Sequence, residues 1–448
     1  MKKFDVFIIG SGMAGMTIAN KCASKGLTVA ITDELPYGGT CALRGCDPKK
    51  VLIGATEVVD FATRLKGKGI DTVSTIDWSS LMAYKQIFVD PVPANIEKGY
   101  NKSGITTYHS PAKFISANQL VVDNETVEAG KIVVASGAKT RKLQIPGEEY
   151  TINSTDFLNL KELPQSLIFV GGGYIAFEFA HIAARSGAKV TIVHRGKSPL
   201  ERFEQDIVKH LVTATKELGI EILLETEVIE IQKENEQYLV IGNANGEPIK
   251  VKAQTVINSA GRTPAIFDLE LDAANIKYGK KGIIVNEYLQ SVSNHNVYAA
   301  GDCADTKGLP LTPVAVMEGH IVSSNIIKGN NKKPDYNAIP TVVFTLPSVA
   351  SVGITEKEAQ EQNLDIKVNF NSVPNWFNAR RLNAKEYAYK TIIDKSSDKI
   401  VGAHLIGPYA EETINLFAMA IKAGLKATDI KSMIFSYPTL ASDISYMV

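Results

Sequence analysis

The chain has 448 residues, more than one hydrophobic core normally organises, so we expect about two to four domains. An apolar content of 45% and a charged content of 21% are typical of a soluble globular protein. The 48 basic residues balance 48 acidic ones, which gives no support for a nucleic-acid or membrane-surface partner, and no stretch approaches the ~18 apolar residues of a membrane span.

The N-terminal segment partly resembles a secretory signal, because Met1–Lys3 precede the apolar run Val6–Ala19. Asp5 interrupts this pattern, and the glycines inside the run have a regular spacing of their own. We therefore expect a cytoplasmic protein. Four scattered cysteines in a chain of this size do not indicate a framework of structural disulfides.

The first elements form a βαβ pattern. A buried strand is predicted over Lys3–Ile9, a glycine-rich turn over Gly10–Gly15, a helix to about Lys25 and a second strand over Leu27–Thr32. This is the arrangement in which a dinucleotide binds at the first turn.

The turn reads Gly10-x-Gly12-x-x-Gly15, and Asp33 closes the second strand. Glycines let the backbone turn tightly and approach a pyrophosphate, whose charge lies at the helix N-terminus. A carboxylate at the position of Asp33 accepts hydrogen bonds from ribose hydroxyls. The alternative is a glycine-rich turn without a ligand.

Two cysteines lie five residues apart in the next segment, GGTCALRGCDPKK (38–50). A zinc site needs about four ligands, and neither a second cysteine pair nor a histidine pattern supplies them. A redox pair formed by Cys41 and Cys46 is the favoured interpretation, with zinc ligation or unrelated buried thiols as alternatives. A regular helix would hold the two residues too far apart for a disulfide, so the segment must bend, and Gly45 permits this.

The glycine-turn pattern returns in the middle of the chain. A strand over Ser166–Val170 leads into Gly171-x-Gly173-x-x-Ala176, then a helix over Phe177–Ser186 and a strand over Lys189–Val193. Two such units imply two dinucleotides or two halves of one site.

The second of these strands is not followed by an acid. Arg195 and Lys197 follow it instead, and they could bind a 2′-phosphate, which a carboxylate would repel. We therefore favour NADPH and keep NADH open; the alternative is that both cations only solvate the surface.

The remaining elements are a largely helical region over Asp77–Lys102 and short apolar strands that end in small-residue turns. A polar linker is predicted over Gly329–Asn337. Beyond it, Pro340–Val448 mixes strands and helices in an α+β pattern. The predicted strands before small-residue turns are Ile132–Ala135, Thr255–Asn258 and Asn296–Ala300, and the predicted C-terminal elements are Val342–Thr345, Ile366–Phe370, Tyr389–Asp394 and Glu411–Ala423.

In this order the motifs resemble those of the pyridine-nucleotide disulfide oxidoreductases, the family of glutathione reductase, lipoamide dehydrogenase and mercuric reductase. The resemblance runs over nearly the whole chain and leans toward the glutathione-reductase branch. The matching segments are GGTC-x4-C-x-P-K-K (38–50), GGGYIAFE (171–178), GRTP (261–264), AGD (300–302), LTPVA (311–315) and TVVFT (341–345), with Pro347 and Val352-Gly353.

The resemblance implies an α/β fold with two Rossmann-like dinucleotide-binding domains and a C-terminal α+β dimerisation domain. It implies an FAD-binding domain formed by residues 1–145 and 265–330, an NAD(P)-binding domain at 146–264 and an interface domain at 335–448. It also implies a homodimer in which each active site contains residues of both chains.

The resemblance further implies the roles of individual residues. Cys46 is the thiol that faces the flavin and Cys41 the thiol that attacks substrate, while Lys49 and Glu178 form an ion pair near flavin N5. Tyr174 covers the nicotinamide pocket. The implied FAD-binding residues are Gly10, Gly12, Gly15, Asp33, Gly39, Thr40, Ala135, Gly137, Gly301 and Asp302. The implied NADPH-binding residues are Gly171, Gly173, Tyr174, Ile175, Arg195, Lys197 and Gly261.

The C-terminal motif departs from the family pattern His-Pro-Thr-x-x-Glu. Tyr437 stands at the position of the histidine that moves protons between the thiols, Ser442 at that of the glutamate, and Asp443 comes one residue late. A phenol with a reference pKa of about 10 is a poor base at neutral pH but can donate a proton. Tyr437 is thus a candidate proton donor; packing at the dimer interface is the alternative.

Other departures concern the substrate. No cysteine follows Cys303, which argues against mercury reduction, and His320 and Asn20 replace arginines that contact glutathione in that enzyme. Asp47 replaces the usual apolar residue after the second cysteine. Its charge would disfavour a thiolate unless Arg44 offsets it or the side chain faces away.

We therefore expect an enzyme acting on sulfur groups, in which NADPH reduces FAD, FAD reduces the Cys41–Cys46 disulfide, and Cys41 attacks a small disulfide or another thiol-reactive oxidant. The alternatives are a dihydrolipoyl dehydrogenase-like enzyme, an oxidoreductase that uses quinones or oxygen, and a flavin redox sensor without turnover.

Overall fold

The computed structural model describes all residues from Met1 to Val448 and divides into two compact units. Each unit is assembled from three segments of the chain, and the expected division into three domains stays a prediction. The first unit comprises Met1–Lys50, Ala83–Arg141 and Arg262–Tyr336; the second comprises Val51–Met82, Lys142–Gly261 and Asn337–Val448.

A seven-stranded sheet forms the core of the first unit, in the order β3-β2-β1-β6-β5-β4 with β18 also paired to β6. The central strands of this sheet are continuous apolar runs because both faces of the sheet are buried. The parallel strands are β1 Lys2–Ile9, β2 Val29–Thr32, β3 Thr106–Tyr108, β6 Glu125–Val134 and β18 Val297–Ala299. The antiparallel edge consists of β4 Ala112–Phe114 and β5 Gln119–Val122.

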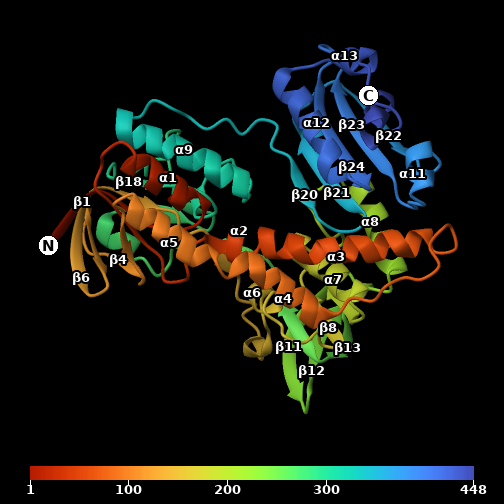
Figure 1. Ribbon diagram of the computed structural model, residues 1–448, viewed down its shortest axis with the longest axis horizontal. Helices are drawn as coiled ribbons and strands as arrows, with labels where there is room; N and C mark the ends of the chain where they lie inside the picture. The colour runs from red at the N-terminus through yellow and green to blue at the C-terminus, as the bar shows by residue number, and fades with distance from the viewer. The chain divides into compact units, whose positions relative to one another are not determined.

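Helices α1 (Met13–Ala23) and α9 (Thr312–Lys328) of this unit pack side by side (Figure 1). Gly319 permits the close approach, since a Cβ there would lie 3.0 Å from the carbonyl oxygen of Ala14. The unit also holds α2 Gly39–Arg44, α5 Val92–Lys102 and two small sheets, made of β7 Ala138–Thr140 with β15 Arg262–Pro264, and of β16 Tyr278–Gly279, β17 Gly282–Ile284 and β19 Ala304–Asp305.

Two helices have residues in both units, namely α3 (Cys46–Leu65) and α4 (Trp78–Val89). The region 77–102 is helical as expected, but it consists of α4 and α5 with a break at Pro91. A proline lacks the amide hydrogen and clashes with the preceding turn, so a continuous helix would be interrupted there.

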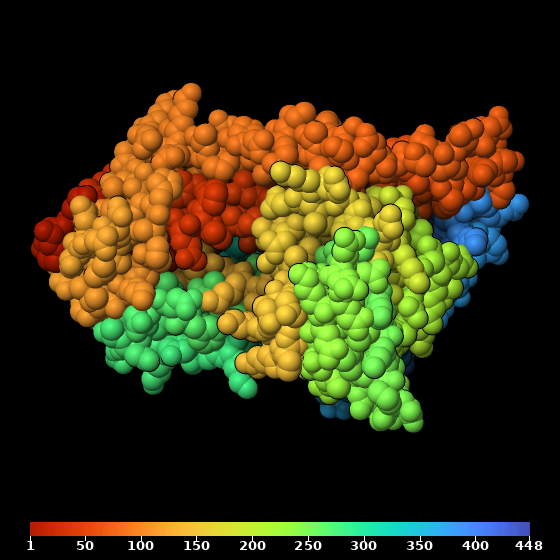
Figure 2. All heavy atoms as spheres, turned by 90° about the horizontal axis from the view of Figure 1, so that it is seen from below, coloured from red at the N-terminus to blue at the C-terminus, as the bar shows by residue number.

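The second unit contains a parallel sheet in the order β10-β9-β8-β14. Its elements are α6 Ser154–Phe157, β8 Ser166–Val170, α7 Tyr174–Arg185, β9 Lys189–Val193, α8 Gln205–Glu217, β10 Glu221–Leu223 and β14 Thr255–Asn258. An antiparallel sheet follows, made of β11 Thr226–Glu234, β12 Gln237–Ala244 and β13 Glu247–Ala253 (green in Figures 1 and 2). This sheet was not predicted from the sequence, although Asn245-Gly246 supplies the two positive φ angles of a tight hairpin.

The same unit ends in a five-stranded antiparallel sheet, ordered β20-β21-β24-β23-β22, which α12 covers (blue in Figure 1). The strands are β20 Thr341–Val343, β21 Ser348–Gly353, β22 Ile366–Ser372, β23 Ala388–Asp394 and β24 Ile400–Gly407. The helices are α10 Glu356–Glu361, α11 Phe377–Arg381, α12 Ala410–Ala423, α13 Ala427–Ser432 and α14 Ile444–Met447.

Two Rossmann-like parallel sheets and a C-terminal α+β region confirm the expected fold class. The predicted linker at 329–337 contains no helix or strand, and the side chain of Asn325 accepts hydrogen bonds from the amides of Asn331 and Lys332 within it. No helix combines the length and the apolar character that crossing a membrane requires.

Candidate active site

The first glycine turn packs tightly against neighbouring backbone. Gly10 has a φ of +103°, and a Cβ on it would lie 2.3 Å from the carbonyl oxygen of Ala135. A Cβ on Gly15 would lie 2.0 Å from the carbonyl oxygen of Gly10. Helix α1 begins after Gly12 without a side-chain cap, so its first amides are available to an anion.

Asp33 is fixed at the end of β2 by the same turn. Its Oδ2 accepts hydrogen bonds from the amide of Ser11 at 2.8 Å and from the Ser11 hydroxyl at 2.7 Å, and its Oδ1 accepts one from the amide of Leu35 at 3.0 Å. Carboxylate oxygens accept more than one hydrogen bond, so the group retains capacity for ribose hydroxyls.

The segment that carries the cysteines packs directly on this turn. Gly39 has a φ of +67°, and a Cβ on it would lie 2.5 Å from the Cα of Gly12. The amide of Gly38 donates to the hydroxyl of Ser11 at 3.2 Å. Glycine at these positions therefore lets α2 begin in backbone contact with the first glycine turn, next to Thr40 and Cys41.

Asp302 is held by a residue to which the sequence assigned no role. Arg262 forms an ion pair with Asp302 at 3.2 Å and donates to the hydroxyl of Thr40 at 3.4 Å. Burial raises the pKa of Asp302, and the guanidinium opposes that shift. The amide of Gly301 donates to the buried carboxylate of Glu318 at 2.6 Å, so both residues of this turn are fixed. The GRTP segment was the signal that could have identified Arg262.

Gly45 breaks the helical path between the two cysteines, as predicted. Helix α2 ends at Arg44, Gly45 has φ −152° and ψ −107°, and α3 begins at Cys46. Both cysteines are free thiols in this structure; Cys41 is half-buried and Cys46 exposed. The Sγ of Cys46 lies 3.5 Å from the hydroxyl of Thr312, the first residue of α9.

The two thiols differ in proton affinity. A hydrogen bond from the Cys41 thiol is the main cause that lowers the pKa of Cys46 to about 6, and contact with Thr312 and the charge of Lys49 act in the same direction. The same hydrogen bond, together with burial, raises the pKa of Cys41 well above its usual range. In the reduced pair these shifts favour a proton on Cys41 and a thiolate on Cys46.

Asp47 does not face away from the thiols. Its Oδ1 lies 3.9 Å from the Sγ of Cys41, at the long end of thiol–carboxylate contacts. Its negative charge raises the pKa of both cysteines. Arg44, the cation expected to offset this charge, lies at the end of α2.

The second glycine turn, in the second unit, is built like the first. Gly171 has a φ of +122°, and a Cβ on it would lie 2.4 Å from the carbonyl oxygen of Ser259. A Cβ on Gly172 would lie 2.6 Å from the ring of His194. Helix α7 begins after Gly173 without a side-chain cap. His194 was not assigned a role from the sequence, and it limits the space at this turn.

The predicted NADPH-binding residues flank that turn. Arg195 and Lys197 follow β9, and both are exposed and form no ion pair. Tyr174 is 41% exposed at the start of α7, followed by the half-buried Ile175. Gly261 has a φ of +115°.

Glu178 is buried in α7 and accepts a hydrogen bond from the amide of Phe344 at 2.8 Å. It belongs to the second unit and Lys49 to the first, so the ion pair between them stays a prediction.

Tyr437 extends from the C-terminal region into solvent. It is 75% exposed, its hydroxyl has no hydrogen-bond partner in the chain, and its ring centroid lies 6.4 Å from that of Phe377. Ser442 bonds to Thr439, and Asp443 accepts hydrogen bonds from Asn378 and Tyr387, each at 2.9 Å. Neither Ser442 nor Asp443 therefore orients Tyr437.

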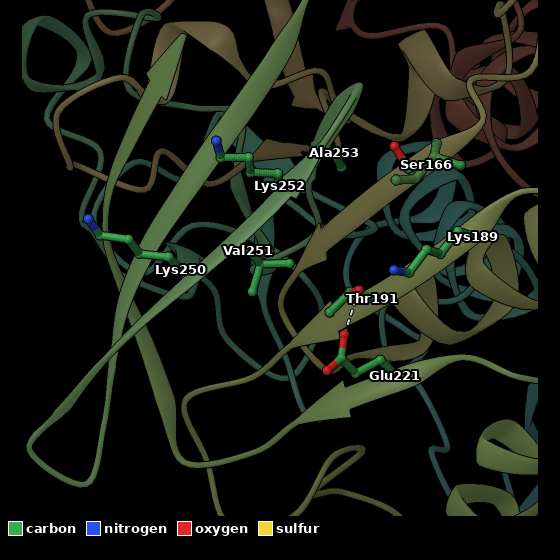
Figure 3. A pocket seen from close by; sticks show the side chains of 9 residues that line it. Ser166, Lys189, Thr191, Glu221, Lys250, Val251, Lys252 and Ala253 are labelled. Atoms are coloured by element: carbon green, nitrogen blue, oxygen red, sulfur yellow. Dashed lines mark hydrogen bonds between the residues drawn. The ribbon is translucent and has the colours of Figure 1, made fainter. Parts of the chain in front are cut away.

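A cavity of about 320 Å³ lies in the second unit (Figure 3). It is located at the amino ends of β8 and β9, marked by Ser166 and Lys189, whereas the glycine turn follows the carboxyl end of β8. Thr191 donates to Glu221 inside it at 3.1 Å. It is not part of the candidate active site.

Comparison with known proteins agrees with the motifs. The family model described as pyridine nucleotide-disulphide oxidoreductase matches residues 4–319, and the model of the corresponding dimerisation domain matches residues 339–448. Glutathione reductase from Burkholderia cepacia is 31% identical over 442 residues, covering 98% of this chain and 97% of that protein. Mercuric reductase from Staphylococcus aureus is 30% identical over 453 residues, covering 98% and 81%.

A solved structure is also similar over its full length. The Cu(II) complex of the HOCl-induced flavoprotein disulfide reductase RclA from Escherichia coli superposes with a TM-score of 0.88 at 29% identity, covering 100% of this chain and 99% of that one.

Proposed function

Because this chain belongs to the pyridine nucleotide-disulphide oxidoreductase family, we propose that it uses NADPH and FAD to reduce a small disulfide or another thiol-reactive oxidant through Cys41 and Cys46. The observation that carries the proposal is the thiol pair itself. Cys41 and Cys46 are free thiols on either side of the break at Gly45, on a segment in backbone contact with the first glycine turn, and the contact with Cys41 lowers the pKa of Cys46.

The family binds FAD and NAD(P)H, and the first unit fits an FAD. Gly10, Gly15 and Gly39 let backbone segments pack tightly at this turn, where a Cβ would clash with neighbouring backbone atoms, and the uncapped start of α1 suits a pyrophosphate. Asp33 and Asp302 supply acceptors for hydroxyl groups. Bound FAD would supply the two-electron relay between the nicotinamide and the thiol pair.

The thiols supply the chemistry on the substrate side. The Cys41 sulfur attacks one sulfur of a substrate disulfide, forms a mixed disulfide and releases the first thiol. The Cys46 thiolate then attacks the Cys41 sulfur, releases the second product as a thiolate, which takes a proton from solvent, and closes the Cys41–Cys46 disulfide. Two electrons leave the enzyme, and the oxidant is reduced to two thiols.

The cofactor preference is testable at the end of β9. We expect Arg195→Ala/Lys197→Ala to raise the KM for NADPH about tenfold or more, because two charge-assisted contacts to a 2′-phosphate are lost. The KM for NADH should stay near the wild-type value. Lys189→Ala, a cation at the opposite end of β9, serves as the control. An unchanged KM for NADPH in the double variant would show that neither cation binds the 2′-phosphate.

Tyr437 is proposed as a proton donor supplied by the partner subunit of a homodimer. The matched dimerisation domain, the exposure of Tyr437 and the exposed neighbour Ile434, at 99%, support this arrangement. We expect Tyr437→Phe to slow reoxidation of the reduced enzyme by disulfide about tenfold, with the rate of flavin reduction by NADPH unchanged. Stopped-flow absorbance separates the two rates. Equal reoxidation rates in Tyr437→Phe and the wild type would exclude Tyr437 as the proton donor.

A thiol-reactive oxidant other than glutathione disulfide is the favoured substrate. His320 and Asn20 stand where glutathione reductase has arginines, and no cysteine follows Cys303 to carry mercury as in mercuric reductase. RclA, a disulfide reductase induced by HOCl, has the same architecture. The test is a panel of oxidised glutathione, coenzyme A disulfide, lipoamide, cystine and small oxidants, each with NADPH and NADH. Activity with lipoamide would favour the dihydrolipoyl dehydrogenase alternative.

The proposed location is the cytoplasm.

A further inference from the structure

The attacking thiol contacts a carboxylate within its own chain. Asp47 follows Cys46 in the first turn of α3, and its Oδ1 lies 3.9 Å from the Sγ of Cys41. Catalytic hydrogen bonds are often long before substrate binds. Asp47 is exposed, so it can exchange its proton with solvent between turnovers.

The other groups around the thiols cannot take a proton from Cys41 and return it. Lys49 and Arg44 are cations with no acceptor capacity, and the hydroxyl of Thr312 is not a base at neutral pH. Cys46 accepts the hydrogen bond from Cys41, but its thiolate is needed as the nucleophile of the second step. Tyr437, proposed above to come from the partner subunit, is a phenol, which donates a proton more readily than it removes one.

We propose that Asp47 is the catalytic proton acceptor for Cys41; the proposal rests on the proposed function. As the Cys41 sulfur bonds to the oxidant, its proton moves to the Asp47 carboxylate and the substrate S–S bond breaks. The carboxylic acid then gives that proton to the departing thiolate. The Cys46 thiolate next displaces the second thiolate, which takes a proton from water or from the Tyr437 proposed to come from the partner subunit, and the Cys41–Cys46 disulfide closes.

The surroundings of Asp47 bring its proton affinity closer to that of a thiol. Burial raises the pKa of Asp47, and the contact with Cys41 opposes this shift. A simpler role also exists, since an acidic residue in the first turn stabilises a helix. If Asp47 only stabilises the helix, Asp47→Asn changes the stability of the protein but leaves the pH dependence of the reoxidation rate unchanged.

The test is Asp47→Asn in the holoenzyme, measured as the rate at which a small disulfide reoxidises the NADPH-reduced protein between pH 6 and 9. We expect a loss of about tenfold or more at pH 6.5 that shrinks as pH rises, because solvent hydroxide then removes the proton. Asp47→Glu should recover part of the rate. Asp77→Asn, at the start of α4, is the control for an exposed acid at a helix N-terminus.

A faster reoxidation in Asp47→Asn would overturn the proposal. If the carboxylate only disfavours the thiolate, Asp47→Asn lowers the pKa of Cys41 and accelerates reoxidation at neutral pH. The pH dependence of iodoacetamide labelling of Cys41, followed by mass spectrometry, measures that pKa directly. An unchanged rate at pH 6.5 would also exclude the role. If Cys41→Ser retains turnover, the proposed function fails instead, whatever Asp47 does.

Discussion

Cys41→Ser is expected to lower NADPH-driven reduction of the oxidant by about 10³-fold or more, with the rate of flavin reduction by NADPH unchanged. Serine keeps the shape of the side chain but cannot form the mixed disulfide. Stopped-flow absorbance with NADPH, followed by mixing with the oxidant, measures the two half-reactions separately.

Two further cysteine variants complete this experiment. Cys46→Ser should eliminate the long-wavelength absorption of a thiolate beside oxidised flavin in the two-electron-reduced enzyme. Cys22→Ala, a thiol buried in α1, is the control and should keep full activity. Unchanged turnover in Cys41→Ser would instead favour quinones or oxygen as acceptors with an incidental dithiol, and no turnover with any oxidant would favour a flavin redox sensor.

Gly10→Ala is expected to yield protein that does not retain FAD. The new Cβ would lie 2.3 Å from the carbonyl oxygen of Ala135, at a φ of +103° that side chains rarely adopt. β1 and β6 would have to separate at the turn that approaches the pyrophosphate. The measurement is the ratio of absorbance at 450 nm to that at 280 nm in the purified protein.

Gly26→Ala is a matched control for the backbone conformation. Gly26 also has a positive φ, +82°, but a Cβ there meets nothing within 4 Å. The variant should lose some stability and keep its flavin. Equal flavin content in Gly10→Ala and the wild type would contradict the assignment of this turn to FAD.

Much of the architecture was predictable because strong local patterns marked it. The apolar runs of β1 and β8, each followed by glycines, predicted both parallel sheets, and the spacing of Cys41 and Cys46 predicted the break at Gly45. These inferences depend on backbone geometry within a few residues, which the sequence displays directly.

The remainder depends on contacts between distant segments. Thr312 reaches Cys46 across 266 positions, and the partners of Arg262 follow from the pairing of β15 with β7. The orientation of Asp47 was open because a residue in the first turn of a helix can face either side. The sheet β11–β13 went unrecognised because β11 and β13, which flank the apolar run of β12, are rich in charged residues and largely exposed.

The central claim is that Cys41 and Cys46 exchange between a dithiol and a disulfide during turnover. The most direct measurement is mass spectrometry of the peptide containing both cysteines after rapid alkylation. We expect two alkylated thiols in this peptide after NADPH and none after a subsequent equivalent of oxidant, with the alkylation of Cys22 and Cys303 unchanged. Alkylation of Cys41 and Cys46 that does not respond to NADPH or to the oxidant would contradict it.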